Sequence, residues 1–211
     1  LVNDYGCDSL RMYELFVGPP ELDAEWDDRG IDGVNRFLKR LWNLLMDSKE
    51  ADVQPTKEMI KLRHKMVYDI TNRLESFSLN TVISGFMEYN NKFIEMAKKE
   101  GGIDKETLET IAVLLSPFAP HFAEEMWEQL GHGETIFKAG WPSYDESAMK
   151  DDEIEVPVQI NGKTRAVISI SADASKDEAI AAGKEAVADK LTGTIVKEIY
   201  VPKKIINIVQ K

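Results

Sequence analysis

The sequence predicts a mainly α-helical protein in two parts, a helical bundle followed by a small α+β domain with the element order β-β-α-β-β. Three observations lead to this fold class. Apolar residues recur every three or four positions as far as about residue 130, which is the period of bundle helices. After about residue 152 apolar and polar residues alternate, which is the period of a strand. Asn161-Gly162 lies between two alternating segments and is a strong hairpin signal.

The first part contains a series of helical stripes separated by Gly, Pro or capping residues. We expect helices at about 8–17, 30–47, 55–77, 78–101, 104–115 and 120–131. Asp8 or Ser9 can cap the first of these, and Ser78 and Asp104 can cap two later ones, because short polar side chains accept hydrogen bonds from free N–H groups of a first turn.

The second part combines strand and helix signals. Strands are expected at 156–160 and 166–170, on either side of the Asn161-Gly162 turn, and again at 195–201 and 205–209. Ser175-Lys176-Asp177-Glu178 has the pattern of a capping box, which opens a helix that we expect to reach about residue 191. Short links between these elements predict a small sheet with one helix packed on it.

No catalytic or metal-binding pattern is present in the sequence. Cys7 is the single cysteine, so it can form neither an internal disulfide nor a four-cysteine zinc site, and we expect it to be a small buried residue. His64, His121 and His132 do not have metal-ligand spacing, so we expect no metal. His121 is expected to make a structural hydrogen bond, and Glu124 and Glu125 to be solvated or to cap a backbone. We therefore predict no catalytic residue.

Targeting signals are also absent. No apolar run approaches the roughly 18 residues of a membrane span, and no signal segment is visible, so we expect no membrane partner and a cytoplasmic location. The chain begins with Leu1 rather than Met, and we expect it to be a piece of a longer protein.

The formal net charge of −11 argues against nucleic-acid binding, because phosphate contacts need Lys and Arg. Local groups of Lys, Arg and His residues nevertheless indicate surfaces that could bind phosphates. The candidate nucleic-acid-binding residues are, in the bundle, Arg29, Arg36, Arg40, His64 and Lys65, and, in the second part, Lys163, Arg165, Lys197, Lys203 and Lys204. Lys61, Arg63 and Arg73 belong to the same helical series. The alternative for all of them is an ordinary solvated surface with ion pairs to neighbouring acids.

Four tryptophans could stack on bases, although a place in the core or at the rim of the bundle is the simpler expectation. They are Trp26, Trp42, Trp127 and Trp141.

Several motifs carry a resemblance to class I aminoacyl-tRNA synthetases. Asp4-Tyr5-Gly6-Cys7-Asp8-Ser9-Leu10-Arg11 is similar to the segment after the lysine loop of the ATP site in that group. Leu115-Ser116-Pro117-Phe118-Ala119-Pro120-His121, followed by Glu124-Glu125-Met126-Trp127 and Trp141-Pro142, looks like the anticodon-binding bundle of the leucine, isoleucine and valine enzymes. Val156-Pro157-Val158-Gln159-Ile160-Asn161-Gly162-Lys163 and the segment 201–209 resemble the C-terminal domain of bacterial leucyl-tRNA synthetases.

The resemblance implies a division of the chain and a function. Residues 1–20 would end the linker region of a catalytic domain, 21–145 would form the anticodon-binding-type bundle, and 152–211 would form a small tRNA-binding domain. The whole protein would activate leucine with ATP and Mg²⁺ and transfer it to tRNA(Leu), as a monomer that also contains catalytic and editing domains. The piece itself, which lacks the ATP-binding motifs, would only hold tRNA and would need no cofactor.

Two alternatives remain open at this point. The chain could be the equivalent region of a valyl- or isoleucyl-tRNA synthetase, or a non-catalytic helical module that binds a protein. One departure from the family pattern is Lys203, which stands where the family often has Gly in a Pro-Gly-Lys turn.

Overall fold

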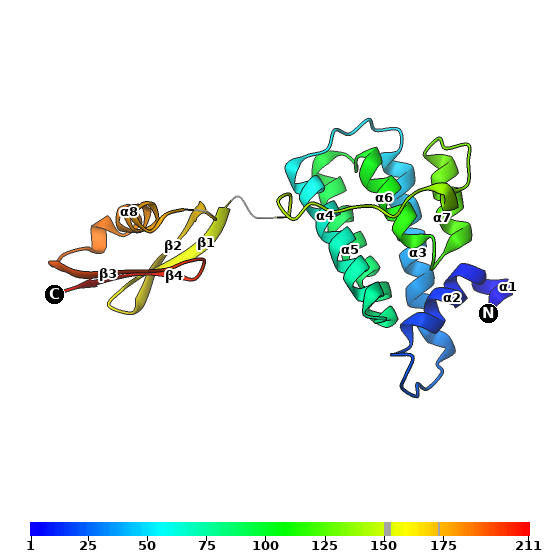
Figure 1. Ribbon diagram of the computed structural model, residues 1–211, viewed down its shortest axis with the longest axis horizontal. Coiled ribbons are helices and arrows are strands. Elements are labelled where there is room, and N and C mark those ends of the chain that lie inside the picture. The colour runs from blue at the N-terminus through cyan, green and yellow to red at the C-terminus, as the bar shows by residue number, and fades with distance from the viewer. Residues whose placement is uncertain (150–152, 173) are drawn as a thin grey trace. The chain divides into compact units, whose positions relative to one another are not determined.

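The computed structural model describes residues 1–149, 153–172 and 174–211. The chain divides into two compact units, Leu1–Met149 and Lys150–Lys211 (Figure 1). The first unit contains helices and the second contains the only sheet found in the described residues, which confirms the predicted fold class of a helical bundle followed by a small α+β domain.

The first unit follows the predicted series of helices closely. Its α-helices are α1 (Val2–Tyr5), α2 (Cys7–Phe16), α3 (Ile31–Ser48), α4 (Lys57–Glu75), α5 (Leu79–Glu100), α6 (Lys105–Leu115) and α7 (Pro120–Gln129), with short 3₁₀ turns η1 (Asp28–Gly30) and η2 (Ile136–Lys138). None of the helices in the described ranges is both long and apolar enough to cross a membrane.

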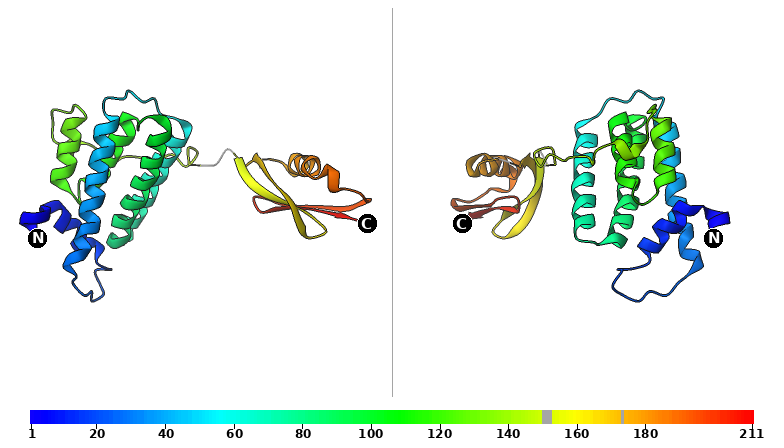
Figure 2. Two further views of the ribbon diagram at one scale, coloured as in Figure 1. Left: turned by 180° about the vertical axis from the view of Figure 1, so that it is seen from behind. Right: turned by 45° about the vertical axis from the view of Figure 1, so that its right-hand side comes forward.

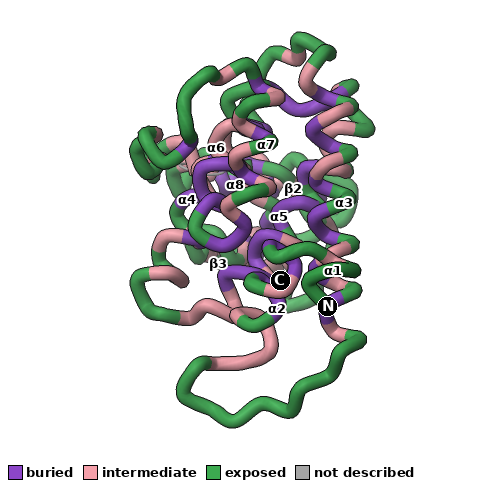
Figure 3. Tube along the Cα trace, turned by 90° about the vertical axis from the view of Figure 1, so that its right-hand side faces the viewer, coloured by how far each residue is buried: buried purple, intermediate pink, exposed green. Residues whose placement is uncertain are grey.

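The core of the bundle lies between the apolar stripes of these helices. Along α3, buried segments alternate with exposed ones, and Ile31, Leu41 and Leu45 are almost completely buried (Figure 3). The stripe recurs every three or four residues, so one side of α3 faces the core while the other faces solvent. Phe93 of α5 and Met66 of α4 are buried in the same cluster. The exposed side of α3 is therefore free to carry polar residues with another role.

The caps of the helices match the sequence in part. Asp104 caps α6 as predicted, because its Oδ1 accepts a 3.0 Å hydrogen bond from the N–H of Thr107. Ser78 is the N-cap residue of α5, but its hydroxyl pairs with that of Ser76 rather than with a backbone N–H. The prediction that Asp8 or Ser9 caps the first helix is wrong.

Gly6 is the N-cap residue of α2, in a conformation (φ 84°, ψ 162°) that is essentially restricted to glycine. The helix therefore starts at Cys7, one residue earlier than expected. The prediction of a buried Cys7 is also wrong, since the thiol is exposed. Asp8 and Ser9 take the buried positions of this turn, because this face of α2 packs against α7 and Asp8 finds hydrogen-bond donors there.

The second unit is a four-stranded sheet with a helix on one side (Figure 2). Its elements are β1 (Glu153–Ile160), β2 (Lys163–Ser171), α8 (Lys176–Ala186), a 3₁₀ turn η3 (Ala188–Lys190), β3 (Ile195–Val201) and β4 (Ile205–Gln210). The strand order is β2-β1-β4-β3, with β1 and β4 parallel and the other pairs antiparallel. The capping box at Ser175 and Glu178 is confirmed, but α8 ends at Ala186, before the predicted residue 191.

The turn between β1 and β2 has the predicted chemistry. Asn161 and Gly162 both have positive φ, 50° and 80°, as a two-residue type I′ turn requires. The side chain of Asn161 also donates to the carbonyl of Gln210 and accepts from its N–H, at 3.1 and 2.9 Å. This turn is therefore fixed to the end of β4 as well as to its own hairpin.

Candidate nucleic-acid interface

A row of cations lies on the exposed side of α3. Arg36, Lys39 and Arg40 are exposed, and their spacing of three and four residues puts them on one face of the helix. In the part of the chain that the structure describes, none of the three has a carboxylate within ion-pair distance. We call these residues the α3 cation row. Unpaired cations on a rigid helix can meet phosphates without first breaking an internal ion pair.

A pocket of about 650 Å³ adjoins the cation row. Lys39, Asn35 and Trp42 of α3 line one side of it, and the N-terminal segment and the start of α7 line the others. Trp42 packs edge-to-face on Phe122 of α7, with 5.8 Å between ring centroids. The pocket is thus walled by three segments that are far apart in the sequence, and the ammonium group of Lys39 is its one unpaired cation among the described residues.

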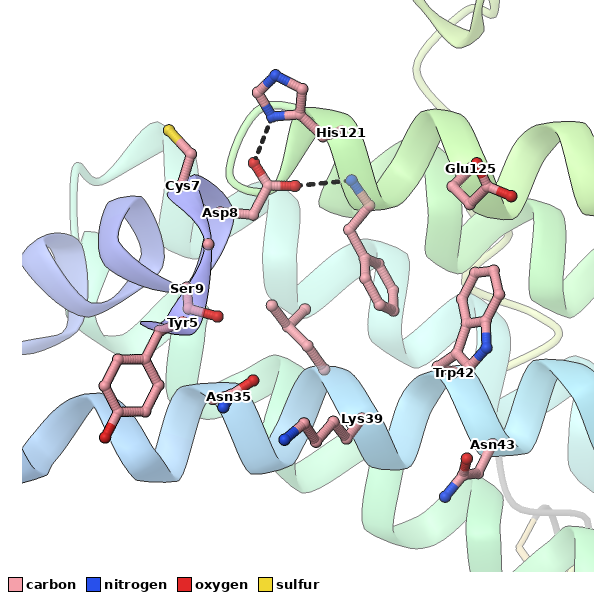
Figure 4. A pocket seen from close by; sticks show the side chains of 13 residues that line it. Tyr5, Cys7, Asp8, Ser9, Asn35, Lys39, Trp42, Asn43, His121 and Glu125 are labelled. Atoms are coloured by element: carbon pink, nitrogen blue, oxygen red, sulfur yellow. Dashed lines mark hydrogen bonds and ion pairs between the residues drawn. The ribbon is translucent and has the colours of Figure 1, made fainter. Parts of the chain in front are cut away.

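Asp8 holds the walls of this pocket together (Figure 4). Its carboxylate, which is only 8% exposed as a residue, accepts a 2.7 Å hydrogen bond from the N–H of Phe122 and lies 2.9 Å from Nδ1 of His121. The free N–H groups of the first turn of α7 attract a carboxylate through both hydrogen bonding and the helix dipole. His121 therefore makes the structural hydrogen bond that was predicted for it.

Arg29 is exposed but already has an ionic partner. Its Nε and Nη2 donate to the two carboxylate oxygens of Asp27, each at 3.0 Å. This bidentate pair raises the pKa of the Arg29 guanidinium and lowers the pKa of Asp27. Because both side chains are well exposed, solvent screens the pair, and a phosphate could compete for the guanidinium only against this neighbour.

His64 lies on α4 and contacts the segment that follows η2, residues 139–145. Its Nδ1 accepts a 3.1 Å hydrogen bond from the N–H of Asp145. The same segment is attached to α4 twice more, through Trp141, whose indole N–H donates to Thr71 at 3.0 Å, and through an edge-to-face contact of Tyr68 with Tyr144. His64 is therefore used to hold this segment, whereas its neighbour Lys65 is half-buried with no carboxylate partner in the described residues.

Two arginines of the same helical series are structural. Arg63 is 7% exposed, and its Nη1 lies 3.4 Å from Asp104 and 2.9 Å from Glu106. Arg73 donates from Nη1 to the carbonyl of Thr81 at 2.7 Å. Both arginines link α4 to a neighbouring helix. Sequence alone did not separate them from the exposed cations, because all of them recur at helical spacing.

The five candidate cations of the second unit lie at three places on its sheet. Lys163 and Arg165 follow the β1–β2 turn, Lys203 and Lys204 lie in or next to the β3–β4 turn, and Lys197 lies within β3. Ile160, at the end of β1, pairs with Ile208, and Val158 with Ile206. The β1–β2 turn therefore lies beyond the far end of β4, whereas the β3–β4 turn precedes its near end. The structure does not bring the two turns together.

The β3–β4 turn contains Lys203, the residue that departs from the Pro-Gly-Lys pattern described above. Lys203 has φ 60°, and the N–H of Lys204 donates to the carbonyl of Val201 at 3.0 Å. A turn with Pro at its second position and a positive φ at its third is the type that favours glycine. Lys203 therefore adopts the left-handed conformation that the family glycine would adopt freely, and it adds a charge at the turn.

The tryptophans and the paired glutamates have structural contacts. The ring of Trp26 packs on Tyr13 at 4.9 Å, and that of Trp127 stacks on His132 at 3.7 Å. Glu124 accepts hydrogen bonds from the hydroxyl of Thr135 and, at 3.1 Å, from the N–H of Ile136, so it caps η2. Within the described residues, no group of three or more potential metal ligands is found.

The sequence and the fold match a known class of protein domain. A family profile described as the anticodon-binding domain of tRNA ligase matches residues 56–180, and the chain belongs to this family. Its relatives include the leucine–tRNA ligase of Fervidobacterium nodosum, which is 44% identical over 228 residues, and that of Thermosipho melanesiensis, which is 42% identical over 230 residues. The leucine–tRNA ligase of Phocaeicola vulgatus is 41% identical over 216 residues.

These matches cover 99–100% of this chain, but the chain spans only 22–28% of the length of these relatives. Among solved structures, the LeuRS of Agrobacterium radiobacter K84 agnB2, in a ternary complex with tRNA and LeuAMS, superposes with a TM-score of 0.77 at 25% identity. That match covers 100% of this chain and 30% of the other. The similarity therefore extends over both units.

Proposed function

We propose that this chain is the tRNA-docking part of a leucine–tRNA ligase, and that it positions tRNA(Leu) for chemistry carried out by other domains of the whole protein. The observation that carries the proposal is the α3 cation row, which has three exposed cations and no ionic partner in the described residues, in a chain whose net charge is −11. The relatives favour the leucine enzyme over the valine and isoleucine enzymes.

The physical role would be orientation. Contacts to phosphates fix the position of an RNA without reading its bases, and holding one end of a large substrate restricts where the other end can go. The acidic remainder of the surface would repel RNA elsewhere and so narrow the set of docked poses. Catalytic and editing domains, ATP and Mg²⁺ would belong to the rest of the whole protein, which we expect to act as a cytoplasmic monomer.

The cation row can be tested with a triple variant of the chain, Arg36→Ala/Lys39→Ala/Arg40→Ala. The affinity for a tRNA(Leu) transcript, followed by fluorescence anisotropy at several salt concentrations, should fall by about tenfold or more, and the slope of log K against log [salt] should decrease by about 2–3. A matched control replaces Lys99, Lys105 and Lys138 by Ala. These lysines are exposed and paired with carboxylates.

The control removes the same formal charge from other faces, so it should change the affinity much less than the triple variant does. If the two triple variants lost the same affinity for tRNA(Leu), only the net charge of the chain would matter. The assignment of the α3 cation row as the tRNA-binding surface would then be wrong. A chain that binds a protein partner but no tRNA would favour the protein-docking alternative.

A further inference from the structure

The sheet of the second unit has one covered face and one open face. The helix α8 lies on one side of the sheet (Figure 2). Val156, Val158, Ile206 and Ile208 are completely buried on that side. A Cβ added to Gly183 of α8 would come within 3.0 Å of Ile206. Side chains alternate along a strand, so the residues between these apolar ones point to the opposite face. Within residues 153–172 and 174–211, no helix covers that face.

Irregular pairing in the two edge strands places a cation on each side of the open face. In β2 the register shifts so that Val158 pairs with Ala166 but Gln159 pairs with Thr164, which leaves Arg165 as an extra residue. Since Ala166 packs with the covered core, alternation puts Arg165 on the open face. A bulge can redirect a side chain in this way without breaking the sheet.

A similar shift in β3 leaves Val196 extra, so that Lys197 pairs with Val209. Val209 follows the buried Ile208 and lies on the open face, and Lys197 lies beside it. Glu198 points to the other face, where it forms an ion pair with Lys184 of α8. The carboxylate nearest to Lys197 in the sequence is thus on the opposite side of the sheet and already paired.

Two amide side chains lie between these cations on the central strands. Gln159 of β1 and Asn207 of β4 are partners in the parallel register. The Nε2 of Gln159 donates to the hydroxyl of Thr164 at 3.4 Å, and Oδ1 of Asn207 accepts from the N–H of Gly162 at 3.3 Å. The carbonyl oxygen of Gln159 and the NH₂ group of Asn207 have no hydrogen-bond partner in the described part of the chain. One acceptor and one donor are therefore available side by side.

The charges of the open face are separated along the strands. Arg165 lies in β2 beside Gln159, whereas Lys197 lies in β3 beside Val209, two residues along β4 from Asn207, whose own partner in β3 is Ile199. Neither the guanidinium nor the ammonium group lies within ion-pair distance of a carboxylate in the described residues. Glu153 and Glu155 lie at the start of β1, away from the amide pair, and Glu153 accepts a hydrogen bond from Ser169. The end of the face that carries the amides is thus positive and complementary to an anionic ligand.

We propose that this band, made of Arg165, Gln159, Asn207 and Lys197, binds unpaired nucleotides of RNA. This inference rests on the proposed function. It specifies which surface of the second unit contacts RNA and which form of RNA, the unpaired strand, that surface binds. The amide pair offers a donor and an acceptor to the edge of a base, and the two cations lie where flanking phosphates would pass. A flat sheet face cannot enter the deep, narrow major groove of an RNA duplex, but it can receive bases that have left the stack.

The test uses the whole 211-residue chain. A ¹⁵N-labelled sample is titrated with a tRNA(Leu) transcript, with a short single-stranded RNA of mixed sequence, and with a short RNA duplex. The side-chain amide signals of Gln159 and Asn207 should shift with the first two ligands. Gln159→Leu, which keeps the size but removes the amide, should weaken binding of the single strand by about tenfold.

A matched pair of charge reversals separates the open face from the rest of the domain. Lys197→Glu should weaken binding of the single strand by about tenfold, whereas Lys176→Glu, at the exposed start of α8, should change it by less than about twofold. Both lysines are exposed, and neither has a carboxylate partner in the described residues.

The outcomes distinguish this inference from the proposed function. If the transcript binds, and the α3 variant weakens it while neither Gln159→Leu nor Lys197→Glu has an effect, the open face is not the RNA surface and tRNA docking stands. If the duplex competes as well as the single strand, the assignment to unpaired nucleotides is overturned. If no RNA binds to the chain in any form, both proposals fail.

Discussion

The carboxylate of Asp8, in the first turn of α2, accepts a hydrogen bond from the N–H of Phe122, in the first turn of α7. A residue near the start of the chain thus caps a helix more than a hundred residues later. We expect Asp8→Ala to lower the free energy of unfolding of the first unit by about 2 kcal/mol, because a buried cap and its hydrogen bonds are lost together. Urea unfolding followed by tryptophan fluorescence measures this, since all four tryptophans lie in residues 1–149.

The control for that prediction is Asp4→Ala. Asp4 is exposed, and its one ionic partner among the described residues is the N-terminus, at 3.4 Å, so its replacement should have little effect. If the two variants unfolded at the same urea concentration, the Asp8 carboxylate would contribute no more than a surface charge does.

Arg63 provides a second prediction about the bundle. It is 7% exposed and lies between Asp104 and Glu106. Arg63→Ala leaves the carboxylate of Asp104 buried without its cation, and the loss of one partner of a buried pair typically costs about 3–5 kcal/mol. Lys105→Ala removes an exposed lysine that pairs with the half-buried Glu109 at 3.7 Å, and it should cost less than about 1 kcal/mol in the same urea experiment. If Arg63→Ala lowered the free energy of unfolding by less than about 1 kcal/mol as well, water would be solvating the Asp104 carboxylate in place of the guanidinium.

The left-handed backbone at Lys203 predicts an unusual gain of stability. Lys203→Gly should stabilise the second unit by about 0.5–1 kcal/mol, because glycine adopts φ 60° without the penalty that a Cβ brings. Lys203→Ala removes the same charge but keeps the Cβ, so it should give no such gain. Hydrogen exchange of peptides from β3 and β4 reports on this unit. If β3 and β4 were equally protected from hydrogen exchange in the two variants, the left-handed backbone at Lys203 would carry no free-energy penalty.

The capping box of α8 predicts a dependence on pH. Hydrogen bonds from Ser175 lower the pKa of Glu178, so the charged carboxylate is favoured in the folded state. Stability from this group is fully present above the ordinary glutamate pKa of about 4.3 and is lost as the pH falls below that value and through the lower folded pKa. Hydrogen exchange of α8, converted to opening free energies, should show a loss over this range in the wild type and a smaller loss in Glu178→Gln.

Most of the fold could be predicted from the sequence because its signals are local. The helical period, the box at Ser175 and Glu178 and the turn at Asn161-Gly162 each depend on a few neighbouring residues. The position of Cys7 could not be predicted, since it depends on Asp8 meeting α7. For the same reason, sequence alone could not separate Arg63, which is buried against Asp104, from the exposed cations of the candidate interface.

The residues that lie together on the open face of the sheet could likewise not be predicted from the sequence. The charge of Arg165 and Lys197 makes them candidates, but only the strand register places them on one face. Nothing in the sequence distinguishes Gln159 and Asn207 from other exposed amides. A single strand gives no sign that two amides nearly fifty positions apart become neighbours, because their pairing follows from the parallel contact between β1 and β4.

The parallel pairing of β1 with β4 also has a consequence for the order of events at the ribosome. The hairpin of β1 and β2 is synthesised first, but β1 remains an edge strand until residues 205–210 have emerged and taken their place beside it. Until then the backbone groups of β1 that later pair with β4 are open to pairing with another nascent chain. A protein truncated before β4 would keep that hazard permanently, and it should be cleared by quality-control proteases rather than accumulate.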